Sequence, residues 1–248
     1  MRSEDVKRLY DDSYAAAYES KFLTSAVTSG DSAHEIKLLG ELLKPESHWL
    51  DVACGTGYFL RQFPNIRRTG LDLSPAMLQV ARDGNPDVEL IEHDFQVPIP
   101  AWTDRFDLVS CMWYSYCLVD TVAALSLVVD NLASWTAPGG TCFVPLADPA
   151  LITGVNLPYR RPDPNWLEGE VTVTGILWGY SEEGGRKRHT HLVAPHVDFM
   201  VEMFESRFEK VNLLRYPPAF PGWTGRPVII ATQKKALHTP GYADRALA

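Results

Sequence analysis

Apolar residues recur at three- and four-residue steps through the first 45 residues, which is the period of an amphipathic helix. One stripe runs from Val6 to Phe22 and contains three tyrosines, Tyr10, Tyr14 and Tyr18. The motif Ser32-Ala33-His34-Glu35 has the spacing of a capping box. A second helix is therefore expected to start there and to end before Pro45.

Between residues 46 and 147, short apolar runs alternate with helical patterns. A helix is expected from Tyr58, a second from Pro75 with Ser74 as its cap, and a third over 121–135 after Asp120. The runs that predict strands are 49–53, 69–72, 88–92, 106–112 and 141–146. Because strands and helices alternate, we expect a parallel sheet with helices on both faces.

The pattern changes after Asp148. Residues 149–169 are rich in proline and predict a loop, whereas 171–180 alternates as a strand does. A turn over 182–185 and a return strand over 188–193 would complete a small antiparallel insertion. We expect a helix opened by Pro195 to follow, and then two strands over 208–216 and 227–232. Residues 237–248 are expected to form a loose tail.

Composition and charge narrow the class of protein. The chain has 248 residues, is 46% hydrophobic and carries a net charge of −8, as expected of one soluble α/β domain. The negative charge disfavours nucleic acid as a substrate. No apolar run is long enough to span a membrane, and the first ten residues are too charged for a signal peptide, so a cytoplasmic protein is expected.

The four cysteines show no spacing typical of metal sites or disulfide frameworks. We therefore expect neither a disulfide nor a bound metal. The small side chain of Cys54, inside the glycine-containing segment described next, is interpreted as a buried filler rather than a nucleophile.

A glycine turn followed by an acidic strand end is the main chemical signal. Gly55 and Gly57 fall between a predicted strand and a predicted helix, where a ligand can lie against bare backbone. Asp72 ends the next strand, about 20 residues further on, where a carboxylate accepts hydrogen bonds from ribose hydroxyls. Leu60 stands where the dinucleotide fingerprint has its third glycine, which weakens an NAD or FAD interpretation.

Five landmarks in order resemble class I S-adenosylmethionine-dependent methyltransferases, over roughly residues 5 to 147. They are Asp51-Val52-Ala53-Cys54-Gly55-Thr56-Gly57, Asp72, His93-Asp94-Phe95, Phe106-Asp107-Leu108-Val109 and Ala137-Pro138-Gly139-Gly140. The resemblance implies S-adenosyl-L-methionine as the cofactor. It also implies a Rossmann-like α/β sheet of about seven strands, mostly parallel with an antiparallel last strand, with helices on both faces and a small antiparallel insertion.

The resemblance implies a single domain over 1–236. Within it, 1–45 would be an N-terminal helical cover, 46–147 the cofactor-binding core, 149–193 a cover over the substrate and 195–236 the end of the sheet. A weaker, architectural likeness points to the branch that includes amino-sugar and glycine N-methyltransferases. The expected partners are a small-molecule substrate and, at most, a second copy in a homodimer, with no nucleic acid and no membrane.

Cofactor contacts can be assigned by the same resemblance. The backbone of Ala53, Gly55 and Gly57 would approach the methionine part of the cofactor, with Asp51 ordering the turn or receiving the ammonium group through water. Asp72 would bind the ribose. The remaining assignments are Leu73, Met77 and Phe95 beside adenine, Asp94 on its amino group, and Met112 and Trp113 near the sulfonium.

Each assignment has a structural alternative. Met77 and Trp113 taken singly are more often core residues. The tyrosine stripe is usually a set of core contacts, although the resemblance raises the expectation that Tyr10 or Tyr18 contacts the cofactor.

Methyl transfer depends mainly on alignment, so a base is optional. If a proton must leave the acceptor, we predict His191 first, because it is farther from the charged turn, then His189 and Tyr114. The two histidines are two residues apart on a predicted strand, so both should face the same side, either pocket or solvent.

The methyl acceptor is expected to be nitrogen or oxygen of a small molecule. Aromatic residues in the insertion suggest a pocket for it, or else the insertion's own core: Tyr159, Trp166, Trp178 and Tyr180. A nicotinamide-dependent oxidoreductase and a catalytically silent S-adenosylmethionine-binding protein remain the alternative functions.

Overall fold

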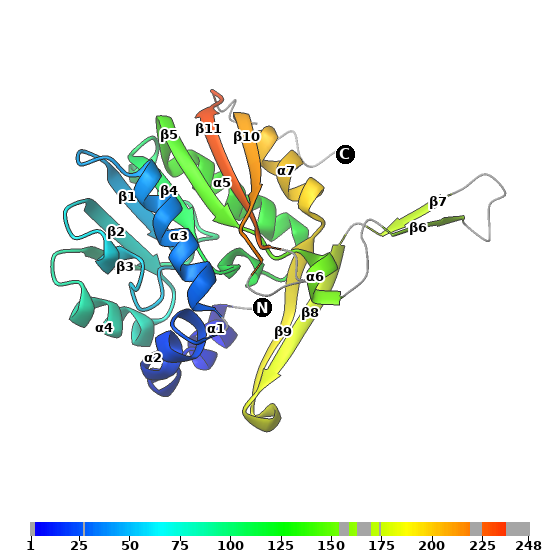
Figure 1. The fold of residues 1–248 in the computed structure, drawn as a ribbon, viewed down its shortest axis with the longest axis horizontal. Helices are drawn as coiled ribbons and strands as arrows, with labels where there is room; N and C mark the ends of the chain where they lie inside the picture. Colours follow the sequence, from blue (N-terminus) through cyan, green and yellow to red (C-terminus); the bar gives the residue numbers. More distant parts are fainter. Residues whose placement is uncertain are drawn as a thin grey trace.

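A computed structural model describes residues 3–26, 28–153, 159–162, 170–173, 175–218 and 225–236. Its centre is a seven-stranded sheet in the order β10-β11-β5-β4-β1-β2-β3 (Figure 1). Strand β11 runs antiparallel to both β5 and β10, and the pairs from β5 to β3 are parallel. The fold class predicted from the sequence is therefore confirmed.

The sheet strands follow the predicted order along the chain. They are β1 (His48–Val52), β2 (Arg67–Asp72), β3 (Glu89–Glu92), β4 (Phe106–Cys111), β5 (Thr136–Pro145), β10 (Phe208–Arg215) and β11 (Pro227–Lys234). The helices are α1 (Ser3–Leu9), α2 (Asp12–Tyr18), α3 (Ser29–Leu42), α4 (Pro75–Gly84), α5 (Val122–Trp135), α6 (Pro149–Thr153) and α7 (Val197–Glu205).

Two apolar clusters lie on opposite faces of the sheet. Adjacent residues of one strand belong to different clusters, because successive side chains of a strand point to opposite faces of the sheet. Leu50 and Val109 join the cluster that contains α5 and α7, and Trp49 and Leu108 join the one that contains Leu39 of α3 and Leu78 of α4. The central strands are thus covered on both sides, as their continuous burial requires.

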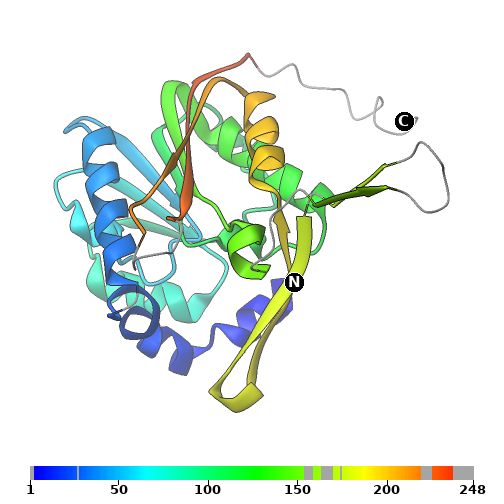
Figure 2. The ribbon, with the colours of Figure 1, turned by 45° about the vertical axis from the view of Figure 1, so that its right-hand side comes forward.

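Two hairpins extend beyond the sheet. β6 (Tyr159–Pro162) pairs with β7 (Glu170–Val173), and β8 (Gly175–Glu182) pairs with β9 (Lys187–Pro195), both antiparallel. The long β8–β9 hairpin runs down to the N-terminal helices α1 and α2 (Figures 1 and 2). The predicted insertion is therefore two hairpins rather than one.

Several local predictions were wrong. The stripe from Val6 to Phe22 forms two helices, because the Asp11 carboxylate accepts a hydrogen bond from Tyr14 N (2.8 Å) and starts α2 anew. The predicted capping box does not cap: α3 begins at Ser29, and the hydroxyl of Ser32 donates to Leu23 O (2.8 Å) from inside the helix. After Gly57 the chain makes only a 3₁₀ turn over Leu60–Gln62 instead of a helix.

The region after Asp148 also differs from the prediction. The expected loop contains α6 and β6, and the expected strand over 171–180 is split between β7 and β8, which belong to different hairpins. Other signals were confirmed, since Ser74 caps α4 by accepting from Met77 N (3.1 Å). Thr121, one residue after the predicted Asp120, caps α5. The predicted tail over 237–248 lies outside the described residues.

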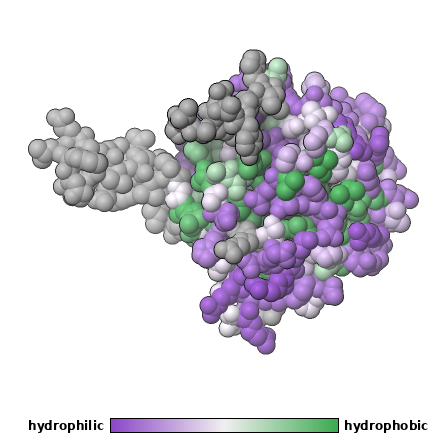
Figure 3. All heavy atoms as spheres, turned by 180° about the vertical axis from the view of Figure 1, so that it is seen from behind, coloured by the Kyte–Doolittle hydropathy of each residue, from purple (hydrophilic) through white to green (hydrophobic). Residues whose placement is uncertain are grey.

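The surface seen from behind is mostly hydrophilic, with apolar areas beside the grey residues (Figure 3). Within the described part of the chain, no helix is both long and apolar enough to cross a bilayer.

Candidate functional site

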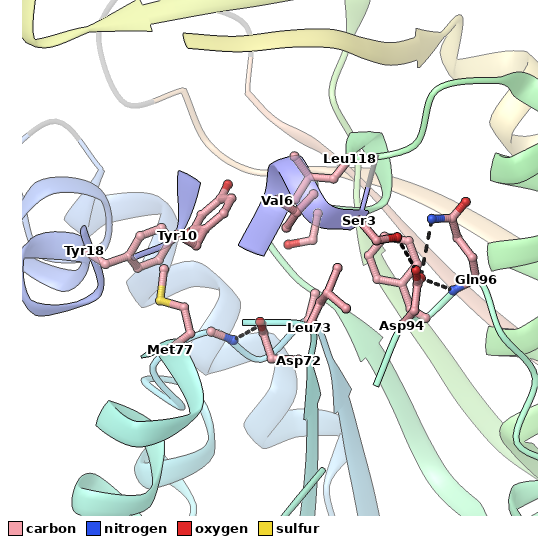
Figure 4. A pocket seen from close by; sticks show the side chains of 14 residues that line it. Ser3, Val6, Tyr10, Tyr18, Asp72, Leu73, Met77, Asp94, Gln96 and Leu118 are labelled. Carbon is pink, nitrogen blue, oxygen red and sulfur yellow. Dashed lines mark hydrogen bonds between the residues drawn. The ribbon is translucent and has the colours of Figure 1, made fainter. Parts of the chain in front are cut away.

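A pocket of about 560 Å³, with the open solvent at its mouth included, forms a cavity at the carboxyl ends of β1 and β2 (Figure 4). The N-terminal helix α1 forms part of its wall through Ser3 and Val6. The predicted cofactor residues that line this cavity are Tyr10, Tyr18, Ala53, Gly55, Asp72, Leu73, Met77, Asp94 and Phe95. Residues from four separated parts of the chain, 10–18, 53–55, 72–77 and 94–95, therefore converge on one space.

The glycine turn and Asp72 are joined directly. Gly55 has φ of 55°, in the left-handed region, and its N–H donates to Asp72 Oδ2 (2.8 Å). The other carboxylate oxygen, Oδ1, accepts from Ser74 N (2.8 Å) at the start of α4. Burial raises the pKa of Asp72 above its ordinary value. The two backbone donors fix the carboxylate and leave each oxygen a second lone pair for a ligand.

Gly57 does something other than the predicted cofactor contact. It lines neither of the two cavities described in this section. A Cβ at this position would lie 2.5 Å from Nδ2 of Asn85 on the C-terminal side of α4. The absent side chain therefore makes room for the contact between the glycine turn and α4.

Asp94 is already partnered at the far end of the cavity. Its Oδ2 accepts from the Ser3 hydroxyl (2.5 Å), and its Oδ1 accepts from Gln96 N (2.9 Å), as Figure 4 shows. Lys7 and Glu92 form an ion pair beside it (2.8 Å), which also joins α1 to the sheet. The first helix is thus held against the edge of the cavity by polar contacts at two positions.

A second, smaller cavity, of about 300 Å³ when open solvent is included, shares Tyr18, Ala53 and Gly55 with the first. Three further predicted cofactor residues line it: Asp51, Met112 and Trp113. Asp51 Oδ1 accepts from the Ser110 hydroxyl (2.6 Å), whereas Asp51 Oδ2 and Thr56 Oγ1 are buried and have no hydrogen-bond partner in the part of the chain that the structure describes. Burial raises the pKa of Asp51 to about 7. Two unpartnered oxygens beside a small cavity indicate a site for a polar ligand group.

The tyrosine stripe divides between the cavity and the β8–β9 hairpin. Tyr10 and Tyr18 line the cavity, whereas Tyr14 turns toward the hairpin and its hydroxyl donates to Glu182 Oε1 (2.7 Å). Lys21 forms an ion pair with the same carboxylate. The N-terminal helices are therefore tied to the hairpin through Glu182.

His189 and His191 do not share a face, contrary to the prediction. The pairing of β8 with β9 shifts register between Trp178 and Tyr180, and His191 has a φ of 60°. This β-bulge breaks the alternation on which the prediction depended. His191 is consequently exposed and lines an outer surface groove with Arg8 and other charged residues, away from the cavity that holds the predicted cofactor residues.

His189 is only 1% exposed and is held on three sides. Its Nε2–H donates to Glu182 Oε1 (2.7 Å), its ring stacks on Tyr180 at a centroid distance of 4.0 Å, and the Tyr10 ring lies 5.9 Å away edge-on. Burial lowers the pKa of His189, and the Glu182 carboxylate opposes that shift. Nδ1 is buried and has no hydrogen-bond partner among the described residues.

Tyr114, the third predicted catalytic residue, lies outside both cavities. Its ring centroid is 4.6 Å from the Arg226 guanidinium carbon, and burial raises the pKa of its hydroxyl to about 12. The hydroxyl is therefore protonated near neutral pH and is not a ready base.

Sequence reasoning missed five residues that line the larger cavity: Ser3, Val6, Gln96, Ser115 and Leu118. Ser115 and Leu118 follow β4, and the rule that ligands bind at the carboxyl ends of parallel strands could have identified them. No comparable signal marks Ser3, whose place depends on how α1 packs. The aromatic residue Trp166 lies outside the described residues, and nothing is described of the Tyr159 side chain.

Comparison with known proteins points to the segment that contains the glycine turn. Residues 50–140 match a family model described as "Methyltransferase domain". This segment holds the glycine turn, Asp51, Asp72 and Asp94. Residues 50–140 therefore carry a methyltransferase domain. The family resemblance predicted from the sequence is thereby confirmed for this domain.

Two curated relatives of the methyltransferase domain illustrate its range. A dTDP-4-amino-2,3,4,6-tetradeoxy-D-glucose N,N-dimethyltransferase of Saccharopolyspora spinosa is 30% identical over 146 residues, which cover 56% of this chain and 57% of that protein. A trans-aconitate 2-methyltransferase of Paracidovorax citrulli is 32% identical over 120 residues, which cover 47% and 44%. The chain thus spans about half the length of these relatives.

A solved structure covers much more of the chain. DesVI of Streptomyces venezuelae superimposes with a TM-score of 0.60 at 22% identity, over 89% of this chain and 97% of that one. At this identity the likeness shows the fold, which extends beyond the methyltransferase domain segment to most of the chain.

Proposed function

We propose that the protein is an S-adenosyl-L-methionine-dependent methyltransferase that acts on nitrogen or oxygen of a small-molecule acceptor by in-line displacement. The observation that carries this proposal is the pair of joined cavities at the glycine turn. One presents the buried carboxylate of Asp72, and the other presents the unpartnered oxygens of Asp51 and Thr56.

The larger cavity suits the adenosine part of the cofactor. Asp72 has free lone pairs for the ribose hydroxyls. Leu73, Met77 and Phe95 offer apolar surface for a purine ring, and Asp94 can accept from its amino group once the Ser3 hydroxyl shares or yields Oδ2. The donor set therefore matches a nucleoside with an exocyclic amine.

The smaller cavity suits the amino-acid part. Asp51 Oδ2 can accept from an ammonium group, which would satisfy a carboxylate that now has one partner only. The Thr56 hydroxyl can donate to a carboxylate. Met112 and Trp113 give the remaining wall an apolar character. A zwitterion beside an adenosine is the chemistry that these two spaces accept together.

A nicotinamide dinucleotide fits less well. Its pyrophosphate is normally bound at the N-terminus of the helix that follows the glycine turn. Here the chain between Gly57 and Phe63, all of it described, makes only a 3₁₀ turn, and Leu60 is completely buried. The site therefore lacks the feature that recognises the second phosphate group.

The bound cofactor would supply a methyl group on a positively charged sulfur. The protein's part is to align the acceptor and exclude water. Tyr10 and Tyr18 line the cavity with their rings, to which a sulfonium is attracted, and their burial raises the pKa of both hydroxyls so that they remain neutral.

Among the three predicted catalytic residues, geometry supports His189 best as acceptor of a departing proton. Glu182 accepts from its Nε2–H, which leaves the lone pair on Nδ1. His189 itself lines neither cavity, but its ring lies 5.9 Å from that of Tyr10, which does, so a proton would have to reach His189 past Tyr10. His191 points to the outer groove, and Tyr114 keeps its proton.

The acceptor is best sought among amines attached to ring-containing metabolites. The β8–β9 hairpin presents a stack of Trp178, Tyr180 and His189 toward the N-terminal helices, and no described residue hydrogen-bonds the buried Nε1 of Trp178. Such a stack can receive a sugar or other ring. The amino-sugar nucleotide named for the Saccharopolyspora relative is therefore the first compound to test, with trans-aconitate second.

Mass spectrometry tests the proposed function. The purified protein is incubated with methyl-¹³C-labelled S-adenosylmethionine and a panel of amino-sugar nucleotides and small carboxylic acids, with NAD as an unrelated cofactor control. We expect a labelled product from one acceptor class and none with the Asp72→Ala variant. Cofactor binding without any labelled product across the panel would instead favour a silent binding protein.

A further inference from the structure

Two consecutive residues at the end of β4 adopt a left-handed backbone. Trp113 has a φ of 52° and Tyr114 a φ of 62°. Large aromatic residues rarely adopt this conformation, because the side chain crowds the backbone, and it persists only where the surroundings hold it. The turn follows Met112 directly, at the carboxyl edge of the sheet where the two cavities lie.

Arg226 is the group that holds both rings. It precedes β11 and is 8% exposed. Its guanidinium carbon lies 4.3 Å from the ring centroid of Trp113 and 4.6 Å from that of Tyr114. A cation within about 6 Å of an aromatic face is attracted to it, and the attraction is stronger where water is excluded. One buried cation thus contacts both strained residues.

Two carboxylates on α3 fix Arg226 in turn. Nη1 donates to Glu35 Oε1 (3.0 Å), and Nη2 pairs with Asp31 Oδ2 (3.0 Å). Glu35 is fully buried, and the Tyr216 hydroxyl donates to the same oxygen (3.4 Å). The guanidinium is therefore clamped between α3 on one side and the Trp113–Tyr114 turn on the other.

The cluster is poorly arranged for stability alone. Among the described residues, Glu35 Oε2 and Arg226 Nε are both buried without a geometric hydrogen-bond partner. Buried ion pairs with unsatisfied atoms are commonly less stabilising than apolar side chains of similar volume. What the cluster does supply is a fixed position for two aromatic rings, one of which, Trp113, lines the smaller cavity beside Asp51.

We propose that Arg226 is a positioning residue that holds the Trp113–Tyr114 turn in its left-handed form, so that the Trp113 ring walls the smaller cavity. This inference rests on the proposed function in so far as that cavity receives the amino-acid end of the cofactor. Glu35 and Asp31 fix Arg226, and Glu35 also interacts directly with the Trp113 side chain. Neither carboxylate lines either of the two cavities.

The first test needs no cofactor. In protein labelled with ¹⁵N-tryptophan, the indole signal of Trp113 is assigned with Trp113→Phe and then followed in Arg226→Met. We expect this signal to shift or broaden while signals of remote tryptophans stay in place. The matched control is Arg105→Met, which should leave the Trp113 signal in place: its guanidinium carbon lies 5.8 Å from the Trp102 ring centroid, and its side chain pairs with Glu89 (3.2 Å). An unchanged Trp113 signal in folded Arg226→Met overturns the proposal.

The second test measures binding of S-adenosylhomocysteine by calorimetry. We expect Arg226→Met to bind about tenfold more weakly than the wild type and Arg226→Lys to recover only part of this loss, because lysine lacks the planar fork. Trp113→Phe and Arg226→Met should be non-additive in the double variant. Additive losses, or wild-type affinity in Arg226→Met, contradict the inference.

A rescue experiment separates positioning from general stability. Glycine adopts a left-handed backbone without strain, so Tyr114→Gly in the Arg226→Met background should restore part of the lost affinity. A merely structural role predicts a further loss instead. If the wild type itself fails to bind S-adenosylhomocysteine, the proposed function falls, whereas the indole signal still decides the role of Arg226.

Discussion

Asp51 is a buried carboxyl group with one partner, the Ser110 hydroxyl, and one unpartnered oxygen beside the smaller cavity. Burial raises its pKa from 3.8 to about 7 in the free protein. Between these two values the folded state holds the proton more tightly than the unfolded state. The contribution of this group to stability is therefore full at low pH and is lost as pH rises toward 7.

A bound ligand with an ammonium group favours the ionised form of Asp51, because the ammonium group pairs with a carboxylate and not with a protonated carboxyl group. We predict that affinity for S-adenosylhomocysteine rises between pH 5.5 and about 7 and then levels off, and that binding near pH 6 releases a proton. Calorimetry in buffers of different ionisation enthalpy measures both. Asp51→Asn should bind weakly with no pH dependence over this range, and a wild-type affinity that is flat with pH would exclude the assigned contact.

Glu182 gives a second pH prediction. Its carboxylate raises the pKa of His189 against the effect of burial. In Glu182→Gln that support is lost, so the His189 pKa should fall further, and the acidic limb of the kcat/KM profile should move to lower pH. His191→Gln, two residues away and exposed, should leave the limb in place. A limb that stays fixed in Glu182→Gln would remove His189 from the proton transfer.

At the scale of the elements, the glycine turn and α4 depend on each other. Gly57→Ala would place a Cβ 2.5 Å from Asn85 Nδ2 and would also strain a φ of 70°. Gly139 has a φ of 80° but open space around it, so Gly139→Ala isolates the backbone effect. Thermal unfolding should show a loss of about 1–3 kcal/mol in Gly57→Ala, clearly above that in Gly139→Ala. Equal losses would show that the contact with Asn85 is of no consequence.

The elements also show where sequence reasoning works. Ser74, Pro75 and the strand that ends at Asp72 were predictable, because their signals are local: a cap, a fixed φ and a period of two. The same local rules failed for Ser32 and Glu35. Ser32 donates to the carbonyl of Leu23, and Glu35 accepts from Arg226. The residues next to Ser32 and Glu35 in the sequence do not indicate these partners. The bulge that turns His191 outward depends on the pairing of β8 with β9, so it could not be predicted from the local sequence either.

In the candidate site, too, residues with a local sequence signal were predictable and residues placed by distant contacts were not. Nearly all predicted cofactor residues line one of the two cavities, because the glycine turn and the strand ends are set by topology. The contributions of Ser3 and Val6 depend on how α1 folds back over the sheet edge, which its short sequence does not specify. Arg226, about 110 residues after Trp113, lay beyond any motif-based argument.

For the whole molecule, the central claim is that a methyltransferase fold uses Asp72 to bind an S-adenosylmethionine-type ligand. A single calorimetric titration of S-adenosylhomocysteine into the wild type and into Asp72→Ala tests it most directly. We predict clear binding to the wild type, no signal with NAD, and roughly 10- to 100-fold weaker binding to Asp72→Ala, because a charged acceptor for two hydroxyls is lost. Equal affinity for the two proteins would contradict the account.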